Sequence, residues 1–319
     1  MVSVQQPRIG IIGAGALGSY FGIRLQNAGF PVSFLLRSDY ESVQKNGLFL
    51  TLSDGKELAV EAPEIYDSSS DMGILDWVVI GLKTTRNHLY KELLPAVVGP
   101  KTLLITIQNG IGNVEELHAL FPDNPIVAGL CQIGVNREAP GRIRSFVPGD
   151  GFAQIGVLSP GSGQDEEHLD SVQGAFEKAG IRTRRTASLG EALWRKLMWN
   201  VPFNGLTVAI GGQSTHIICE DPALRTVARA LMEEIRTAAC ELGYPIEPEY
   251  TDKLLHFTDK MGPYMSSSVL DWLAGRRLEV EAIFRKPLEA GTQAGVAMPT
   301  LATLTAILGG LGIRGGSLE

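Results

Sequence analysis

Cysteine is scarce in this chain, and the cysteines that are present show no motif spacing. The 319 residues include three, Cys131, Cys219 and Cys240, and no two of them form a CxxC pair. An odd number of scattered cysteines is typical of reduced thiols inside the cell rather than of a disulfide framework. The five histidines are also scattered and form no HExxH motif, so we expect no metal site.

Long apolar runs and excess positive charge are missing as well. No stretch of about 20 apolar residues is present, which argues against a transmembrane helix. The N-terminus lacks the basic and then apolar pattern of a signal segment, so the expected location is the cytoplasm. The formal net charge of −7 argues against a general binder of nucleic acids or anionic membranes, although it permits a local positive pocket for a phosphate.

The first half of the chain alternates short β-rich runs with helical patterns, the first helix being expected at 14–29. Continuous Val, Ile and Leu runs separated by helices indicate a parallel sheet that is buried on both faces. We expect its strands at 8–13, 32–37, 77–83, 102–110 and 126–134, with antiparallel additions at 142–147 and 152–158.

Long helical patterns replace the strands from about residue 188 onward. They are expected at 189–210, 222–243, 248–259, 265–274, 277–295 and 300–309. At about 150 residues per domain, the chain length also suggests two domains. The sequence therefore predicts an α/β domain over 1–187, with a mostly parallel, doubly wound sheet of the Rossmann type, and an all-helical domain over 188–312. Residues 159–167 are expected to form a turn that leads into a helix, and 313–319 a flexible tail.

The segment GAGALG at 13–18 has the pattern G-x-G-x-x-G between the first strand and the first helix. In this context the motif indicates dinucleotide binding, because the glycines permit a tight turn, a close approach to the pyrophosphate and close helix packing. The helix start also offers free N–H groups to the phosphates. The alternative is a glycine-rich turn without a ligand. The expected contacts are Gly13, Ala14, Gly15, Ala16, Leu17 and Gly18.

The end of the second strand, FLLRSDY, bears on the choice between NAD and NADP. An NAD site usually places Asp or Glu here to hold the ribose hydroxyls, whereas this chain has Arg37 and Ser38. A guanidinium and a hydroxyl suit a 2′-phosphate, so the sequence favours NADP. Asp39 is one alternative, since a shift of one residue would present a carboxylate instead. The other is that Arg37 is simply a solvated loop charge.

Two further strand ends carry polar residues. VVIGLKTT ends on Lys83, and LLITIQNGIG ends on Gln108 and Asn109. Ligands of open parallel sheets bind beyond the carboxyl ends of the strands. Lys83 is therefore a candidate contact for cofactor or substrate oxygens, and the Asn109 amide for the nicotinamide or a reacting carbonyl. The alternatives are a surface lysine and an ordinary Asn-Gly turn.

A polar stripe crosses the first long helix of the second half, in RKLMWNVPFNGLT at 195–207. Lys196, Asn200 and Asn204 fall within one arc of about 80° on a helix. A lysine partly desolvated between domains would have a lowered pKa and could give a proton to a carbonyl oxygen, while the amides bind substrate oxygens. The alternative is that all three side chains form interhelical or capping hydrogen bonds. Pro202 should kink or open the helix at this place.

Together these segments resemble the ketopantoate reductase (2-dehydropantoate 2-reductase) family over residues 8–312. The resemblance is carried by the order and spacing of GAGALG, GLKTT, QNGIG, LWRKLMWNVPFNGLT, SSSVLDWLAGRRLEVEAI and AGVAMPT. It implies NADP-dependent reduction of an α-keto acid with a distal hydroxyl group, the pantothenate-pathway step. It also implies a helical domain of the 6-phosphogluconate-dehydrogenase C-terminal type, a cleft between the domains and a homodimer.

The resemblance also implies roles for individual residues. Lys196 matches the proton donor, and the family's substrate ligands match Asn200, Asn204, Ser267 and Asn109. The family's cofactor contacts match Arg37 at the 2′-phosphate, and Lys83, Asn109, Val135 and Glu279 near the dinucleotide.

Two positions depart from the family pattern. Phe284 stands where many members have Asn, and Ser214-Thr215 replaces an Asn-Gly pair. Both departures put the exact substrate in doubt. The rival readings are a reductase of another 2-oxo or hydroxy acid on the same fold, and an NADP-binding redox sensor without turnover. Leu318 and Glu319 belong to the expected flexible tail.

Overall fold

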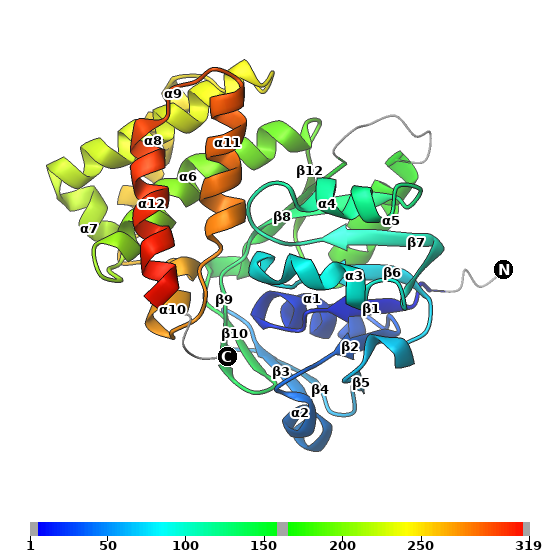
Figure 1. Ribbon diagram of the computed structural model, residues 1–319. Helices are drawn as coiled ribbons and strands as arrows, with labels where there is room; N and C mark the ends of the chain where they lie inside the picture. The colour runs from blue at the N-terminus through cyan, green and yellow to red at the C-terminus, as the bar shows by residue number, and fades with distance from the viewer. Residues whose placement is uncertain (1–5, 158–164, 315–319) are drawn as a thin grey trace. The chain divides into compact units, whose positions relative to one another are not determined.

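The computed structural model describes residues 6–157 and 165–314, and these divide into two units (Figure 1). The first unit comprises residues up to 109 and 113–189, and the second comprises 110–112 and residues from 190 onward. The sequence-based boundary at 188 did not assign the short segment 110–112 to the second unit. Residues 159–164 of the predicted turn and 315–319 of the predicted tail lie outside the described residues.

One sheet of the first unit has the strand order β12-β11-β8-β7-β6-β1-β2-β5. Neighbours from β5 to β8 pair in parallel, whereas β11 is antiparallel to β8, as expected for 152–158. The mostly parallel sheet is therefore confirmed. The bounds are β1 Ile9–Ile12, β2 Val32–Leu35, β5 Glu64–Tyr66, β6 Leu75–Ile80, β7 Val98–Thr106, β8 Ile126–Gln132, β11 Phe152–Gly156 and β12 Thr183–Arg185.

Both faces of this sheet are covered, which explains the continuous apolar runs of its strands. Val79 and Ile105 belong to one buried cluster and their neighbours Val78 and Leu104 to another. Alternate side chains of a strand point to opposite faces, so a strand buried on both faces is apolar at every position. The helices of this unit are α1 Ala16–Asn27, α2 Tyr40–Asn46, α3 Tyr90–Leu93, α4 Asn113–Leu120 and α5 Asp165–Lys178, with the 3₁₀ turns η1 Ser69–Asp71, η2 Thr84–Leu89 and η3 Pro148–Asp150.

A second sheet, with the order β4-β3-β10-β9, was not expected from the sequence. Its strands are β3 Leu48–Thr51, β4 Glu57–Val60, β9 Val135–Ala139 and β10 Arg142–Ser145. The prediction that 142–147 adds to the parallel sheet was wrong, because β10 pairs in parallel with β3 and antiparallel with β9. Helix α1 packs against β1 and β2 on one side and against this second sheet on the other. Residues 18–25 of α1 are consequently all buried.

Helices build the second unit, coloured from green through yellow to red in Figure 1, as the sequence predicts. They are α6 Leu189–Ala209, α7 Thr215–Glu220, α8 Pro222–Glu241, α9 Glu249–Asp259, α10 Ser267–Leu273, the π-helical turn η4 Glu281–Arg285, α11 Lys286–Gln293 and α12 Pro299–Arg314. Helix α7 was not expected, and the predicted helix at 277–295 begins with the π-helical turn. Helix α6 continues through Pro202, so the proline does not end it. Within the described ranges, no helix is long and apolar enough to cross a membrane.

Candidate active site

The glycine loop of the first unit lies where the strand order of the parallel sheet reverses. Gly13 follows β1, and the chain after β6 passes directly beside it. Gly13 has φ +95°, and a Cβ there would stand 2.5 Å from the main-chain nitrogen of Leu82. A Cβ on Gly81 would stand 2.9 Å from the Gly13 oxygen. Open α/β sheets bind ligands at this reversal point, beyond the carboxyl ends of the strands.

The other two glycines of the loop differ in what surrounds them. A Cβ on Gly18 would meet the Gly13 oxygen at 2.2 Å, so α1 packs on the loop only with glycine at this position. Gly15 is exposed, and a Cβ there would meet nothing within 4 Å. It is the N-cap of α1 and brings no side chain to the first-turn N–H groups. A helix start of this kind, with open space above a glycine, fits a pyrophosphate.

The turn after β2 carries Arg37 and Asp39, the two residues that the sequence offers as alternative cofactor contacts, and they differ in exposure. Arg37 is exposed, whereas Asp39 is only 5% exposed. The Asp39 carboxylate accepts a hydrogen bond of 2.9 Å from the Ser38 hydroxyl and lies 2.7 Å from a guanidinium nitrogen of Arg137. Asp39 is thus engaged by the protein, while Arg37 stands at the surface.

A chain of hydrogen-bonded side-chain amides, two of them buried, supports the ends of β6 and β7. The Gln108 amide nitrogen donates to the main-chain oxygen of Leu82 (2.9 Å) and to Oδ1 of Asn87 (2.8 Å). Asn87 in turn donates to Oδ1 of Asn113, whose own amide nitrogen donates to the main-chain oxygen of Asn109. The network thus includes the main-chain oxygens of the predicted residue Asn109 and of Leu82, which directly precedes the predicted residue Lys83. Lys83 itself is exposed and forms the N-cap of η2.

The oxygen side of the Gln108 amide is also fixed. Its Oε1 accepts hydrogen bonds from the hydroxyls of Tyr90 and Thr106. Burial raises the pKa of Tyr90, so its hydroxyl keeps the proton that it donates. Asn87, Tyr90 and Asn113 were not predicted from the sequence, because their partners lie far away along the chain and no local motif marks them.

In the second unit, α6 carries the predicted polar stripe. Asn200 and Asn204 are buried, with exposed fractions of 5% and 3%, and Lys196 is half-buried. Oδ1 of Asn204 is buried and has no hydrogen-bond partner among the described residues. An unsatisfied buried acceptor costs about 1–3 kcal/mol, and this cost is removed when a donor from a ligand reaches it.

The start of α10 lies beside the same helix. The Thr207 hydroxyl, on α6 beyond Asn204, is 3.5 Å from the Ser266 hydroxyl. Ser266 is the N-cap of α10, and its hydroxyl accepts a hydrogen bond from the Val269 N–H. Ser267 is half-buried at the first position of the helix. The structure thus places the predicted Ser267 near the stripe, within the second unit.

The π-helical turn Glu281–Arg285 is the third element at this place. Glu279, which precedes this turn, is buried, with an exposed fraction of 4%. The segment Gly110–Gly112 packs on the same turn, since the Ile111 N–H donates to the Ala282 oxygen at 3.0 Å. The predicted residues of the second unit therefore lie on or beside three elements: helix α6, the start of α10 and the π-helical turn. Those of the first unit lie mainly at the ends of β1, β2, β6 and β7. Val135 begins β9, in the second sheet of the first unit.

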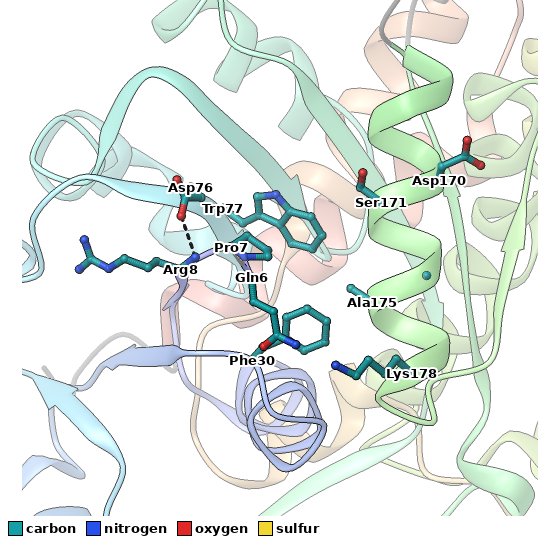
Figure 2. Close-up of a pocket in the computed structure, with 11 residues that line it drawn as sticks. Gln6, Pro7, Arg8, Phe30, Asp76, Trp77, Asp170, Ser171, Ala175 and Lys178 are labelled. Atoms are coloured by element: carbon teal, nitrogen blue, oxygen red, sulfur yellow. Dashed lines mark hydrogen bonds between the residues drawn. The ribbon is translucent and has the colours of Figure 1, made fainter. Parts of the chain in front are cut away.

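A surface pocket of the first unit holds none of these residues (Figure 2). It lies where β1 and β6 begin, beside α5, and its lining includes Arg8, Trp77 and Lys178. The cofactor is expected at the opposite, carboxyl ends of these strands. Among the described residues, no group of three or more His, Cys, Asp and Glu side chains is placed to hold a metal ion.

Comparison with known families shows to which family the chain belongs. The model of "Ketopantoate reductase PanE/ApbA" matches residues 9–159, and that of "Ketopantoate reductase PanE/ApbA C terminal" matches residues 189–312. The chain belongs to the ketopantoate reductase family. It is therefore an oxidoreductase, and the family uses a nicotinamide dinucleotide.

Two relatives of the ketopantoate reductase family show how far the likeness extends. A 2-dehydropantoate 2-reductase of Nostoc sp. is 33% identical over 306 residues, which cover 93% of each chain. The crystal structure of 2-dehydropantoate 2-reductase from Geobacter metallireducens has a TM-score of 0.90 at 37% identity and covers 95% of this chain and 99% of its own. The predicted fold class, an α/β domain followed by a helical domain, is confirmed.

A more distant structure shares the fold alone. The ternary structure of D-mandelate dehydrogenase with NADH and anilino(oxo)acetate has a TM-score of 0.86 at 20% identity, and covers 96% of this chain and 99% of its own. The same fold therefore occurs in an enzyme that is named for a different hydroxy acid.

Phe284 and Thr215, which belong to the two departures from the ketopantoate reductase pattern, are buried. Phe284 is 1% exposed, and a Cβ on Gly205 of α6 would stand 2.8 Å from its ring. Phe284 therefore packs against α6 directly after Asn204. Thr215 is fully buried, its N–H donates to the Tyr264 oxygen, and its hydroxyl has no partner among the described residues.

Proposed function

We propose that this protein reduces 2-dehydropantoate to pantoate with NADPH, and that Lys196 supplies the proton. The observation that carries the proposal is the stripe on α6, a half-buried lysine followed by two buried asparagines. It belongs to a chain of the ketopantoate reductase family, whose curated relative from Nostoc sp. is named for this reaction.

The cofactor-binding residues of the proposal belong to the first unit, apart from Glu279. The open space above Gly15 and the uncapped start of α1 fit a pyrophosphate. The exposed Arg37 suits a 2′-phosphate, whereas the acidic residue of this turn, Asp39, is already engaged by Arg137. When bound, NADPH supplies the hydride for the keto carbon. Lys83, Asn109, Val135 and Glu279 are the further contacts that the family resemblance assigns.

Lys196 performs the proton transfer in this proposal. Its ammonium group donates a hydrogen bond to the keto oxygen, and its positive charge stabilises the negative charge that develops there. The proton moves from Nζ to that oxygen, which leaves a neutral amine, and solvent returns a proton to the amine afterwards. A donor of this kind contributes about 10²-fold or more to the rate.

The amides and one hydroxyl bind and orient the substrate. Oδ1 of Asn204 needs a hydrogen-bond donor, and a substrate hydroxyl group provides one. Asn200, Ser267 and Asn109 are assigned to the remaining polar groups of the substrate, the carboxylate and the keto oxygen. The carboxylate needs donors, which amide nitrogens and a serine hydroxyl supply.

The decisive experiment follows NADPH oxidation with 2-dehydropantoate and a panel of small aliphatic and aromatic 2-oxo acids, and repeats the series with NADH. We expect the highest kcat/KM with 2-dehydropantoate and NADPH. Preference for another 2-oxo acid would replace the substrate but keep the reaction class. NADPH binding without turnover on any keto acid would instead support the redox sensor.

A second candidate, reduction of another 2-oxo acid, is favoured by Phe284. This apolar ring packs against α6 next to Asn204, where many family members carry an amide. A less polar surrounding suits a more apolar substrate, which the aromatic members of the panel test. The homodimer expected from the family resemblance stays a prediction, and sedimentation velocity of the purified protein decides it.

A further inference from the structure

Asp39 is an N-cap residue that does not cap its helix. It precedes α2 at the N-cap position, yet its side chain makes no capping hydrogen bond. Aspartate at this position usually accepts a hydrogen bond from the N–H groups of the first turn. Here the carboxylate oxygen Oδ1 instead accepts from the Ser38 hydroxyl and pairs with Arg137. The carboxylate therefore pairs with Arg137 and does not cap α2.

Arg137 reaches Asp39 from a distant part of the chain. It lies on β9 of the second sheet, opposite Ile143 of β10, and that sheet packs against α1. The side chain of Arg137 is 41% exposed, whereas that of Asp39 is 8% exposed. The Arg137 guanidinium, from a separate sheet, therefore pairs with the buried Asp39 carboxylate in the turn that also carries Arg37.

We propose that Arg137 is a specificity-determining residue that makes the turn after β2 select NADP over NAD. The inference rests on the proposed use of NADPH. In NAD enzymes, a carboxylate in this turn holds the ribose hydroxyls and excludes a 2′-phosphate. Arg137 pairs with Oδ1 of Asp39 and compensates its negative charge, so the carboxylate is less available to the ribose and repels the phosphate less.

The charge balance of the turn supports this role. With Arg137 in place, the charge of Arg37 remains for the phosphate, because Asp39 is already paired. Without Arg137, the negative charge of Asp39 is no longer paired and offsets the positive charge of Arg37 beside the site of the phosphate. Opposite charges a few ångströms apart in a half-buried turn interact strongly enough to change a binding constant about tenfold or more.

The test measures the dissociation constants of NADP⁺ and NAD⁺ by calorimetry, so it does not depend on turnover. In Arg137→Met, we expect the preference for NADP⁺ over NAD⁺ to fall by about tenfold or more. If Arg137 only stabilises the local structure, the variant should bind both cofactors more weakly to the same extent, and the ratio of the two dissociation constants should not change. Arg137→Lys keeps the charge and should keep most of the preference.

The double variant Arg137→Met/Asp39→Asn tests whether Arg137 acts through Asp39. Removal of the carboxylate should restore most of the preference for NADP⁺. If it does not, Arg137 holds the phosphate directly and the proposed route is wrong. Arg144→Met is the matched control, since Arg144 pairs with Glu138 at the exposed surface of the same two strands. It should leave both constants unchanged.

The remaining outcomes are also decisive. An unchanged cofactor ratio in Arg137→Met would overturn the inference. If that variant fails to fold, Asp39→Asn alone is informative, because it should retain or increase the preference for NADP⁺; a loss of preference there would contradict the role of Arg137. A wild-type protein that binds NAD⁺ more tightly would instead refute the proposed use of NADPH, which the wild-type ratio measures separately.

Discussion

The side-chain amide of Gln108 donates a hydrogen bond of 2.9 Å to the main-chain oxygen of Leu82, the residue directly before Lys83. The same amide donates to Asn87 and accepts from Tyr90 and Thr106. Gln108 is only 8% exposed, so these bonds form away from water. One buried side chain thus joins the ends of β6 and β7, where two of the predicted cofactor contacts begin.

Replacement of Gln108 by Leu should therefore destabilise the first unit. The substitution keeps a similar volume but leaves the Leu82 oxygen and the Tyr90 hydroxyl without this partner, at a cost of about 1–3 kcal/mol in the free energy of unfolding. Urea denaturation measures the loss. Gln293→Leu, at an exposed position of α11, should change the free energy by less than about 0.5 kcal/mol. Equal stability of the two variants would show that the network contributes little.

Lys196→Ala should lower kcat by about 10²-fold or more, because the proton donor to the keto oxygen is lost. The assay is NADPH oxidation at saturating 2-dehydropantoate. Lys253→Ala is the control: this lysine is exposed on α9 and should be replaceable without loss of rate. Turnover close to normal in Lys196→Ala would remove this lysine from the mechanism.

Asn204→Leu should separate substrate binding from stability. Oδ1 of Asn204 has no partner among the described residues, so its replacement by an apolar group of similar size should cost the fold less than about 1 kcal/mol. The KM for the keto acid should nevertheless rise by about tenfold, the effect of one lost hydrogen bond to a substrate. Thermal melting and initial rates give the two quantities. A loss of stability with unchanged KM would make Asn204 a structural residue.

The elements that the sequence predicts well are those whose signal is local. The glycine loop sits between a strand and a helix within one short segment, and the stripe from Lys196 to Asn204 follows from helical spacing alone. The four-stranded sheet escaped prediction because its strands are short and come from two distant segments, which join only through the pairing of β3 with β10. The pairing of Asp39 with Arg137 depends on that same sheet, so no local pattern reveals it.

Gly15→Ala should weaken the binding of the cofactor without lowering the stability of the fold. Gly15 has φ −75° and open space around its Cα, so the protein itself accommodates a methyl group. A bound pyrophosphate would occupy that space, and the dissociation constant of NADP⁺ should rise by about tenfold or more. Gly174→Ala, at a helical position in α5 with equally open space, should leave binding unchanged and stabilise the protein slightly. Unchanged cofactor binding in Gly15→Ala would move the pyrophosphate site away from this loop.

The pair formed by Arg195 and Glu247 should make the stability of the second unit depend on pH in the acid range. The Arg195 guanidinium lies 2.6 Å from the Glu247 carboxylate, and this hydrogen bond lowers the pKa of Glu247 from 4.5 to about 2. Because the folded-state pKa is the lower one, the stabilisation is complete above pH 4.5 and is lost as the pH falls towards 2.

Glu247→Gln removes this titration. The variant should be less stable than the wild type at neutral pH, and the difference should shrink as the pH falls from 5 to about 3. Since the Glu247 side chain is 40% exposed, solvent screening limits the difference to less than about 1 kcal/mol. Urea denaturation across this range measures it, with Glu289→Gln at an exposed position of α11 as the control. A difference that stays constant with pH would mean that Glu247 stabilises the unit through packing and not through its charge.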